Sequence, residues 1–316
     1  MKIEKESNNC PSILFLIFNR PETTARVFDA IRLARPARLY IAADGARKDR
    51  VGEEDVVNEV RQIVTQVDWP CEVFKLFRKS NLGCKMAITS AIDWFFETEE
   101  EGVILEDDCL PSANFFEYSS IMLQRYRNEE KIAFVTGTNY FGQNLHSNNY
   151  FYSTFASIWG WATWKRSWMN RCLEMDAWSP KEINDALGKF GIVSNIYLQL
   201  CYRLLTKTNI GQSTWDYQWT FAIIMNGQLA IVPSANLVSN IGVNGTHFKK
   251  GDKRTNLKYG ELNKELLEPK VKNILEDLNY EKKLGRQLLL PLIVRGYFSY
   301  GVRRAKSIIR NTWKFK

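Results

Sequence analysis

The chain has 316 residues, of which 45% are hydrophobic and 13% aromatic, a composition typical of one large or two smaller globular domains. This composition excludes disorder as a description of the whole chain. The formal net charge of +8 and the pI of about 9.1 favour anionic partners. No recognition helix, zinc finger or RNP-like motif accompanies this charge, so we expect no nucleic acid partner.

The first ten residues are polar and lack the apolar core of a signal peptide, and no apolar stretch is long enough to span a bilayer. We therefore expect a cytoplasmic protein. The six cysteines include no Cys-x-x-Cys pair, so neither a zinc cluster nor a dense disulfide framework is indicated. We expect them to be mostly reduced core residues.

Strands and helices alternate along the first part of the chain. The patterns predict strands at 12–18, 38–43, 71–77 and 103–105, and helices beginning at Pro21, over 56–67, after Lys85, and from an N-cap at Ser112 to about residue 126. Residues 46–55 are expected to form a charged loop. Such alternation predicts an α/β fold with a mostly parallel, Rossmann-like sheet, flanked by helices and joined by right-handed crossovers.

Charged residues follow several predicted strands. Arg20 follows the first, Asp44 the second, and Glu106, Asp107 and Asp108 the fourth. Ligands of open α/β sheets bind beyond the carboxyl ends of the strands, and adjacent carboxylates repel unless a cation offsets them. A hard divalent ion would do so. A solvated acidic turn is the simpler explanation of an isolated triplet, and turn chemistry alone explains Asp44 before Gly45.

A basic loop over residues 78–85 precedes the third predicted helix. Its cations are Arg78, Lys79 and Lys85, and a helix N-terminus flanked by cations is suited to an anion. A solvated basic loop explains each of these residues equally well.

The second half carries less regular patterns. They predict strands at 131–138, 150–155 and 229–232 and helical structure over 179–205. Residues 158–168 contain four tryptophans, among them Trp159 and Trp161. Aromatic side chains at this density form a sugar or base platform or, more often, part of the core, where we expect some of them.

Asp216 opens a further predicted helix that ends at Asn226 and Gly227. Ser213 three residues earlier makes a capping box one explanation, and a general base at a helix N-terminus is the other. A glycine-bearing loop, 239–247, contains Gly245 and His247. His247 is a candidate ligand contact and a candidate metal ligand, and a surface histidine explains it as well.

The carboxyl-terminal part is polar over 249–263, and the apolar residues of 294–313 then share one helical face with cations around it. Such a helix suits an anionic membrane surface, and a helix docked on the core explains it equally. We predict a domain over 1–248, with a nucleotide-sugar half at about 10–140 and an acceptor half at about 141–248. Residues 249–316 are expected to form a charged loop and basic amphipathic helices.

The order of these features resembles the nucleotide-sugar glycosyltransferases of the GT-A fold, especially the inverting N-acetylglucosaminyltransferase I group. The likeness covers roughly residues 12–248 and rests on Arg20, Asp44, the acidic triplet 106–108 and the Phe-Phe-Glu-Tyr run at 115–118. In this group a strand ends in Glu-Asp-Asp shortly before such a run. Two departures leave donor and acceptor identity open: Tyr217 stands where the group has an acid, and Asn240 where it has an arginine.

The resemblance implies a role for each matching residue. Arg20 and Asp44 would hold the nucleotide, Glu106 and Asp107 would contact the sugar nucleotide, and Asp108 would ligate Mn²⁺ or Mg²⁺. The pair Trp215-Asp216 resembles the group's Trp-Asp pair, whose aspartate is the catalytic base. The loop 239–245 resembles the segment that closes over the donor.

We therefore expect an inverting, metal-dependent glycosyltransferase that uses a nucleotide-sugar donor, a UDP-sugar by preference. The acceptor would be a saccharide or glycolipid in bacterial surface polysaccharide synthesis, reached at the inner face of the membrane. Two alternatives stay open: a sugar nucleotidyltransferase, which also needs acids, metal and a basic phosphate site, and a non-catalytic protein that binds sugar nucleotides or membrane surfaces. The absence of a glycine-rich phosphate loop early in the chain counts against the nucleotidyltransferase.

Overall fold

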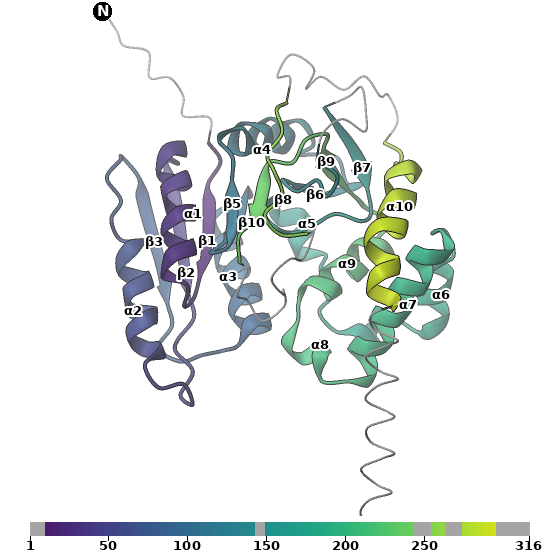
Figure 1. The fold of residues 1–316 in the computed structure, drawn as a ribbon, viewed down its shortest axis with the longest axis horizontal. Coiled ribbons are helices and arrows are strands. Elements are labelled where there is room, and N and C mark those ends of the chain that lie inside the picture. The colour runs from purple at the N-terminus through teal and green to yellow at the C-terminus, as the bar shows by residue number, and fades with distance from the viewer. Residues whose placement is uncertain (1–9, 143–148, 243–253, 263–273, 295–316) are drawn as a thin grey trace, which may run out of the picture. The chain divides into compact units, whose positions relative to one another are not determined.

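The computed structural model of the protein describes residues 10–142, 149–242, 254–262 and 274–294 (Figure 1). The chain divides into two compact units, one formed by residues 1–174 and 211–276 and the other by 175–210 and 277–316. The predicted boundary between residues 248 and 249 lies outside the described residues and stays a prediction.

The first unit is built on one large sheet, and it confirms the predicted α/β fold. Among the described residues the strand order is β3-β2-β1-β4-β8-β6-β9-β7. The strands are β1 (Ile13–Ile17), β2 (Arg38–Ala43), β3 (Glu72–Phe77), β4 (Glu101–Glu106), β6 (Ile132–Thr136), β7 (Tyr150–Ser153), β8 (Trp161–Trp164) and β9 (Leu229–Pro233). Strands β3, β2, β1 and β4 are parallel, as are β6 and β9, whereas β8 and β7 are antiparallel to their neighbours.

Helices cover both faces of the parallel part of the sheet. They are α1 (Pro21–Ala34), α2 (Glu53–Ile63), α3 (Cys84–Thr98) and α4 (Ala113–Arg125), with α5 (Lys165–Met169), α8 (Ile210–Ser213) and α9 (Asp216–Met225) further along the chain. Odd-numbered residues of β1 and β2 share a buried cluster with α1, α2 and α4. Tyr40, which points the other way, stacks on Phe74 and meets Phe95 of α3 edge-on. This alternation is the period of two that a strand imposes.

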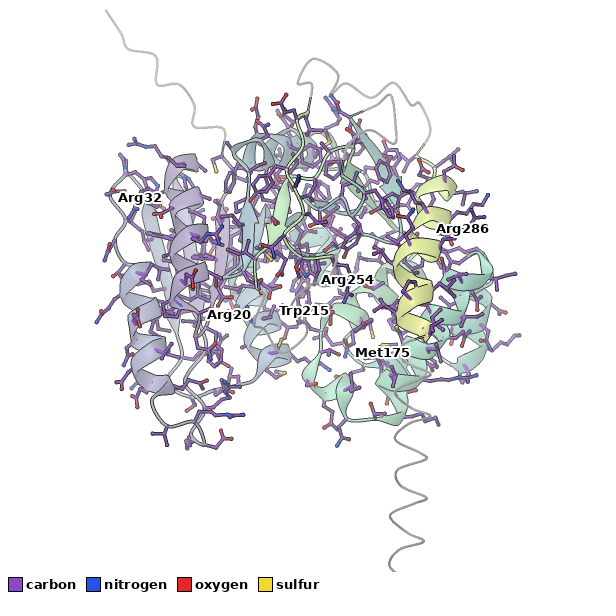
Figure 2. The ribbon with its side chains drawn as sticks, in the orientation of Figure 1. Arg20, Arg32, Met175, Trp215, Arg254 and Arg286 are labelled. Atoms are coloured by element: carbon purple, nitrogen blue, oxygen red, sulfur yellow. The ribbon has the colours of Figure 1, made fainter. Side chains whose placement is uncertain are left out.

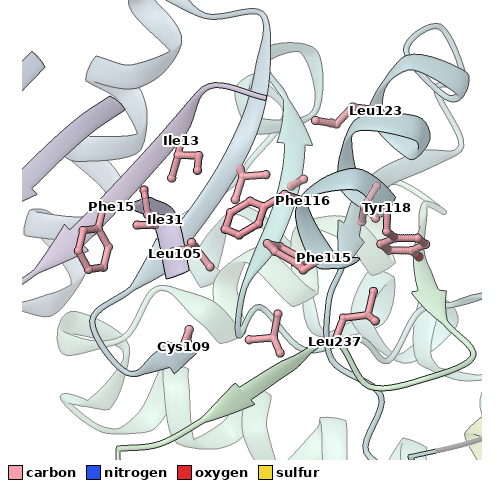
Figure 3. Packing of buried hydrophobic residues seen from close by; sticks show 14 of the residues in the cluster. Ile13, Phe15, Ile31, Leu105, Cys109, Phe115, Phe116, Tyr118, Leu123 and Leu237 are labelled. Carbon is pink, nitrogen blue, oxygen red and sulfur yellow. The ribbon is translucent and has the colours of Figure 1, made fainter. Parts of the chain in front are cut away.

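Figure 3 shows the cluster between the sheet and α4. Ile13, Phe15 and Leu105 come from β1 and β4, and Phe115 and Phe116 of α4 lie against them. All five are almost fully buried. The first two residues of the Phe-Phe-Glu-Tyr run therefore anchor α4 to β1, which Arg20 follows, and to β4, where the acidic triplet begins.

The structure corrects two predictions about the starts of helices. α2 begins at Glu53, inside the predicted loop 46–55, because Glu53 accepts hydrogen bonds from the backbone and side chain of Arg47. Ser112 occupies the N-cap of α4 as predicted, but its side chain makes no capping bond. Its backbone amide instead donates to the Leu237 carbonyl at 2.8 Å.

The tryptophan-rich stretch forms a strand that the sequence did not predict. β8 lies between β4 and β6 and is antiparallel to both. Its Trp161 and Trp164 are 1% exposed, and Trp168 of α5 is fully buried. Trp161 and Trp168 of this stretch pack against each other and against Trp215 and Trp219 from a later segment, with ring centroids 5.3–6.3 Å apart. Most of the stretch is therefore part of the core.

The second unit is helical in its described residues. Its elements are η1 (Met175–Ala177), α6 (Pro180–Leu187), α7 (Ile192–Lys207), α10 (Leu278–Leu284) and the π-helical turn η3 (Gly285–Leu289). The helical stretch predicted over 179–205 is thus two helices with a break after Gly188. Ser179 and Glu182 form a capping box at the start of α6, and Glu281 accepts a hydrogen bond from the Gly191 amide that precedes α7.

Candidate functional site

The sheet reverses its strand order at β1. From β1 the chain moves through β2 to β3, and α3 then returns it to β4 on the other side of β1. β1 and β4 are parallel neighbours, with Leu16 opposite Glu106. Such a reversal leaves a crevice beyond the carboxyl ends of the two strands, where open α/β sheets bind ligands. Arg20 follows β1 and the acidic triplet ends β4, so the predicted site residues meet at this point.

Arg20 joins two of the three acids. Its Nη1 donates to Asp107 Oδ1 at 2.9 Å and to Asp108 Oδ2 at 2.7 Å, while the Phe18 amide donates to Asp107 Oδ2 at 3.1 Å. Asp107 and Asp108 are buried, and Arg20, labelled in Figure 2, keeps a third of its side chain exposed. Asp107 therefore has both oxygens engaged by the β1 end.

Asp108 is also held by a segment from much later in the chain. A small antiparallel pair, β5 (Cys109–Pro111) and β10 (Val238–Asn240), brings the two together (Figure 1). Asn240 Nδ2 donates to Asp108 Oδ1 at 3.2 Å, and the Ile241 amide donates to the Asp108 carbonyl at 2.8 Å. A Cβ atom at Gly242 would lie 2.3 Å from Asp108 Oδ2, so the close approach requires glycine.

Among the described residues, the acids at this site outnumber the cations that pair with them. Burial, with the charges of Asp108 and Asp107, raises the pKa of Glu106 to about 8, although Arg20 opposes the shift. Burial also raises the pKa of Asp107 to about 6, against the opposing charge of Arg20. The arrangement therefore favours any ligand that brings positive charge or hydrogen-bond donors to these oxygens.

The carboxylate set fits a hard divalent cation that is shared with a ligand. Among the described residues no three His, Cys, Asp or Glu side chains are grouped as a protein cage for a metal. Mg²⁺ commonly binds one or two carboxylates together with waters and substrate phosphates. Asp108 offers oxygen ligands in a site with excess negative charge, and its pairing with Arg20 would have to loosen for both of its oxygens to bind an ion.

Asp216 is the first residue of α9 and Trp215 is its N-cap, so the predicted capping box with Ser213 at the N-cap is not formed. Ser213 instead ends α8. A carboxylate at this position is stabilised by the helix dipole. The charge of Asp216 contributes to the raised pKa of Glu106, which places both acids in one electrostatic neighbourhood.

Cys84 belongs to the same neighbourhood, and sequence reasoning missed it. It begins α3 and is an exposed residue, but desolvation of its thiol, together with the charges of Glu106 and Asp216, raises its pKa to about 12. Its position directly after Gly83 in the basic loop 78–85 is the sequence feature that could have identified it as part of the site. All six cysteines are free, and Cys109 and Cys201 are the buried ones.

Asp44 and Lys85 make contacts within the protein. The carboxylate of Asp44 accepts hydrogen bonds from the amides of Gly45, Leu82 and Gly83 at 2.9–3.1 Å, which fixes the loop before α3. Lys85 Nζ donates to the carbonyls of Leu173 and Gly211. These contacts show what both residues do for the fold; their predicted contacts with a nucleotide stay predictions.

The remaining predicted residues divide by exposure. Trp161 and Trp215 are buried in the tryptophan cluster, while Trp159 is partly buried and lies edge-on to Tyr140 with ring centroids 5.8 Å apart. Gly245 and His247 lie outside the described residues, as does nearly all of the predicted helix 294–313. No helix in the described part of the chain has the length and apolarity needed to cross a bilayer.

Comparisons with known proteins add little to this geometry. No protein-family model matches the sequence, and no curated protein matches it. One solved structure, that of a UDP-glucose pyrophosphorylase complexed with UDP-glucose, is similar with a TM-score of 0.35 and 10% sequence identity. The similarity covers 74% of this chain and 94% of that chain. A likeness this weak carries no argument about function, which must come from the site.

Proposed function

We propose that the protein is an inverting, metal-dependent glycosyltransferase that moves a sugar from a UDP-sugar to a hydroxyl of a saccharide or glycolipid. The observation that carries the proposal is the convergence of Arg20 and the triplet Glu106 to Asp108 at the point where the strand order reverses. The resemblance to the GT-A group of N-acetylglucosaminyltransferase I assigns these residues to the nucleotide sugar. The proposed setting is bacterial surface polysaccharide synthesis.

Each residue has a defined task in the proposed reaction. Arg20 and Asp44 would hold the nucleotide, Lys85 would contact its phosphates, and Glu106 and Asp107 would contact the sugar nucleotide. Asp108 would hold Mn²⁺ or Mg²⁺, and the ion would supply charge stabilisation to the departing diphosphate.

Asp216 is the proposed general base. The acceptor oxygen attacks the anomeric carbon and forms the new C–O bond while the bond from that carbon to the phosphate oxygen breaks. UDP leaves with the electron pair, and Asp216 takes the hydroxyl proton. One displacement inverts the anomeric configuration. Asp216 is the first residue of α9, where the helix dipole favours a negative charge.

The test replaces Asp216 with Asn, which keeps the shape and removes the base. We expect turnover, measured as UDP release from a panel of nucleotide sugars, to fall roughly 10²- to 10⁴-fold while donor affinity stays nearly unchanged. Asp68→Asn, an exposed carboxylate in the same unit, is the control. Near-normal turnover of Asp216→Asn would contradict the proposal, and release of pyrophosphate from a nucleoside triphosphate would indicate a nucleotidyltransferase instead.

The predicted basic helix at 294–313 extends the proposal to an anionic membrane surface, where a glycolipid acceptor would be found. A truncation after residue 294 removes none of the residues that the structure describes. We expect it to lower binding to anionic vesicles, and unchanged binding would remove this part of the proposal.

A further inference from the structure

The helix α7 of the second unit exposes an apolar face. Ile192, Ile196, Leu200 and Leu204 follow one another at intervals of four residues and so lie on one side of the helix. Ile192 is 80% exposed, Ile196 43% and Leu204 48%. The opposite side carries the buried residues Ser194, Leu198, Cys201 and Leu205. α7 thus has apolar side chains both toward its own unit and toward solvent.

Cations lie on the same exposed face. Arg203 follows Ile196 by seven residues and Lys207 follows Leu200 by seven, so both share the side of the apolar stripe, and both are exposed. α7 contains no Asp or Glu. Long cationic side chains can extend to phosphate groups while their methylene stems remain against apolar surface.

The charge of the whole protein is concentrated in this unit. The segments 175–210 and 277–316 contain fourteen Lys and Arg and five Asp and Glu, a formal charge of +9. Since the chain carries +8, the residues of the first unit together carry one negative charge. The net positive charge of the composition therefore belongs, by sequence, to the segments of the unit that exposes the apolar stripe.

We propose that the α7 face inserts into the interface of an anionic lipid bilayer, with the four apolar side chains entering between headgroups and Arg203 and Lys207 contacting lipid phosphates. An apolar stripe flanked by cations is the pattern that interfacial helices present, and anionic lipid adds attraction for each cation. A nucleic acid would use the cations but gains nothing from the stripe. The proposal does not depend on the glycosyltransferase activity. The α7 stripe, Arg203 and Lys207 are described residues, whereas residues 295–316 supply seven of the nine net positive charges of the unit.

The experiment measures partition of the full chain onto vesicles of pure phosphatidylcholine and onto vesicles in which about a third of the lipid is phosphatidylglycerol. We expect binding to the anionic vesicles. The double variant Ile192→Gln/Ile196→Gln should lower that binding about tenfold or more, because two side chains lose apolar insertion. Arg203→Gln/Lys207→Gln should lower it roughly fivefold or more.

The matched control is Leu33→Gln, since Leu33 is 84% exposed on α1 of the other unit. Its binding should stay within about twofold of wild type, and all variants should keep the wild-type unfolding temperature. Wild-type binding by both double variants would overturn the proposal, as would an equal loss in the Leu33 control. A change from oligomer to monomer in Ile192→Gln/Ile196→Gln with unchanged vesicle binding would overturn it in favour of a second copy as the occupant.

Discussion

Two groups of carboxylates in the first unit have opposite electrostatic environments. Arg47 binds Glu53 through its side chain and backbone, with a further bond from Asn19, and this holds the pKa of Glu53 down at about 2. At the ends of β1 and β4, by contrast, burial and mutual repulsion raise the pKa of Glu106 to about 8, and a single arginine, Arg20, pairs with both Asp107 and Asp108.

The comparison separates structural carboxylates from candidate ligand-binding ones. The oxygens of Asp44 and Glu53 accept hydrogen bonds from several donors within the protein, and these bonds stabilise the fold. The acids beside Arg20 repel one another in a buried place, which costs stability unless a ligand compensates. A buried excess of charge at a strand-order reversal is therefore a better indication of function than the acidic residues themselves.

The largest expected effect is on ligand binding, which should depend on the acids beside Arg20. Asp108→Ala should weaken metal-dependent binding of the nucleotide sugar by about a hundredfold or more, above the 10- to 100-fold typical of a lost supporting residue. The protein should stay folded, because relief of repulsion offsets the bonds lost from Arg20 and Asn240, and Arg20 keeps Asp107. Titration calorimetry with and without Mn²⁺ measures donor binding, and thermal denaturation measures the unfolding temperature. Unaltered metal-dependent binding would contradict the role of Asp108.

Removing a carboxylate that is already bonded within the protein should lower the free energy of unfolding. Asp44→Ala leaves the amides of Gly45, Leu82 and Gly83 without their acceptor and should lower the free energy of unfolding by about 2–3 kcal/mol. Denaturant unfolding measures it. Asp68→Ala, whose carboxylate is 67% exposed, should change stability little. Full stability of Asp44→Ala would contradict the structural role of these hydrogen bonds, and the donor affinity of the same variant tests the proposed contact between Asp44 and the nucleotide.

The smallest effect concerns pH. The pKa of Glu53 is about 2 in the folded protein against 4.5 ordinarily, so its stabilisation is complete above about pH 4.5 and is lost as pH falls toward 2. Glu53→Gln should lower the free energy of unfolding at neutral pH by no more than about 2 kcal/mol, because Arg47 is partly exposed and screened. The difference between wild type and variant should shrink toward zero near pH 2. A constant difference across this range would show that packing, not charge, distinguishes them.

Much of the parallel part of the sheet was readable from the sequence. The predicted strand at 38–43 agrees with β2 to the residue, and Pro21 and Glu22 begin α1 as expected. These segments are buried on both faces or along one stripe, so hydrophobic period and turn residues identify them. The alternation of strand and helix then sufficed for the confirmed fold class.

The other part of the sheet could not be read in this way. β8 has four buried residues, two of them tryptophans, and shows no alternation of polar and apolar positions. Its place between β4 and β6 depends on pairing with strands about 30 and 60 residues away, which no local pattern encodes. β5 and β10 are three residues each and exist because they pair.

The sequence by itself determined the residue types at the strand ends and the order in which they occur: an arginine, an aspartate, three acids and a later aspartate. Strand periodicity fixes where each chain segment leaves the sheet, which is a local property. Only the tertiary structure decided that β1 and β4 are neighbours, so that Arg20 pairs with Asp107 and Asp108, while Asp44 is turned toward backbone amides. It also placed Asn240 and Gly242 against Asp108 and left the α7 stripe exposed, because contacts between distant segments follow from packing and not from spacing along the chain.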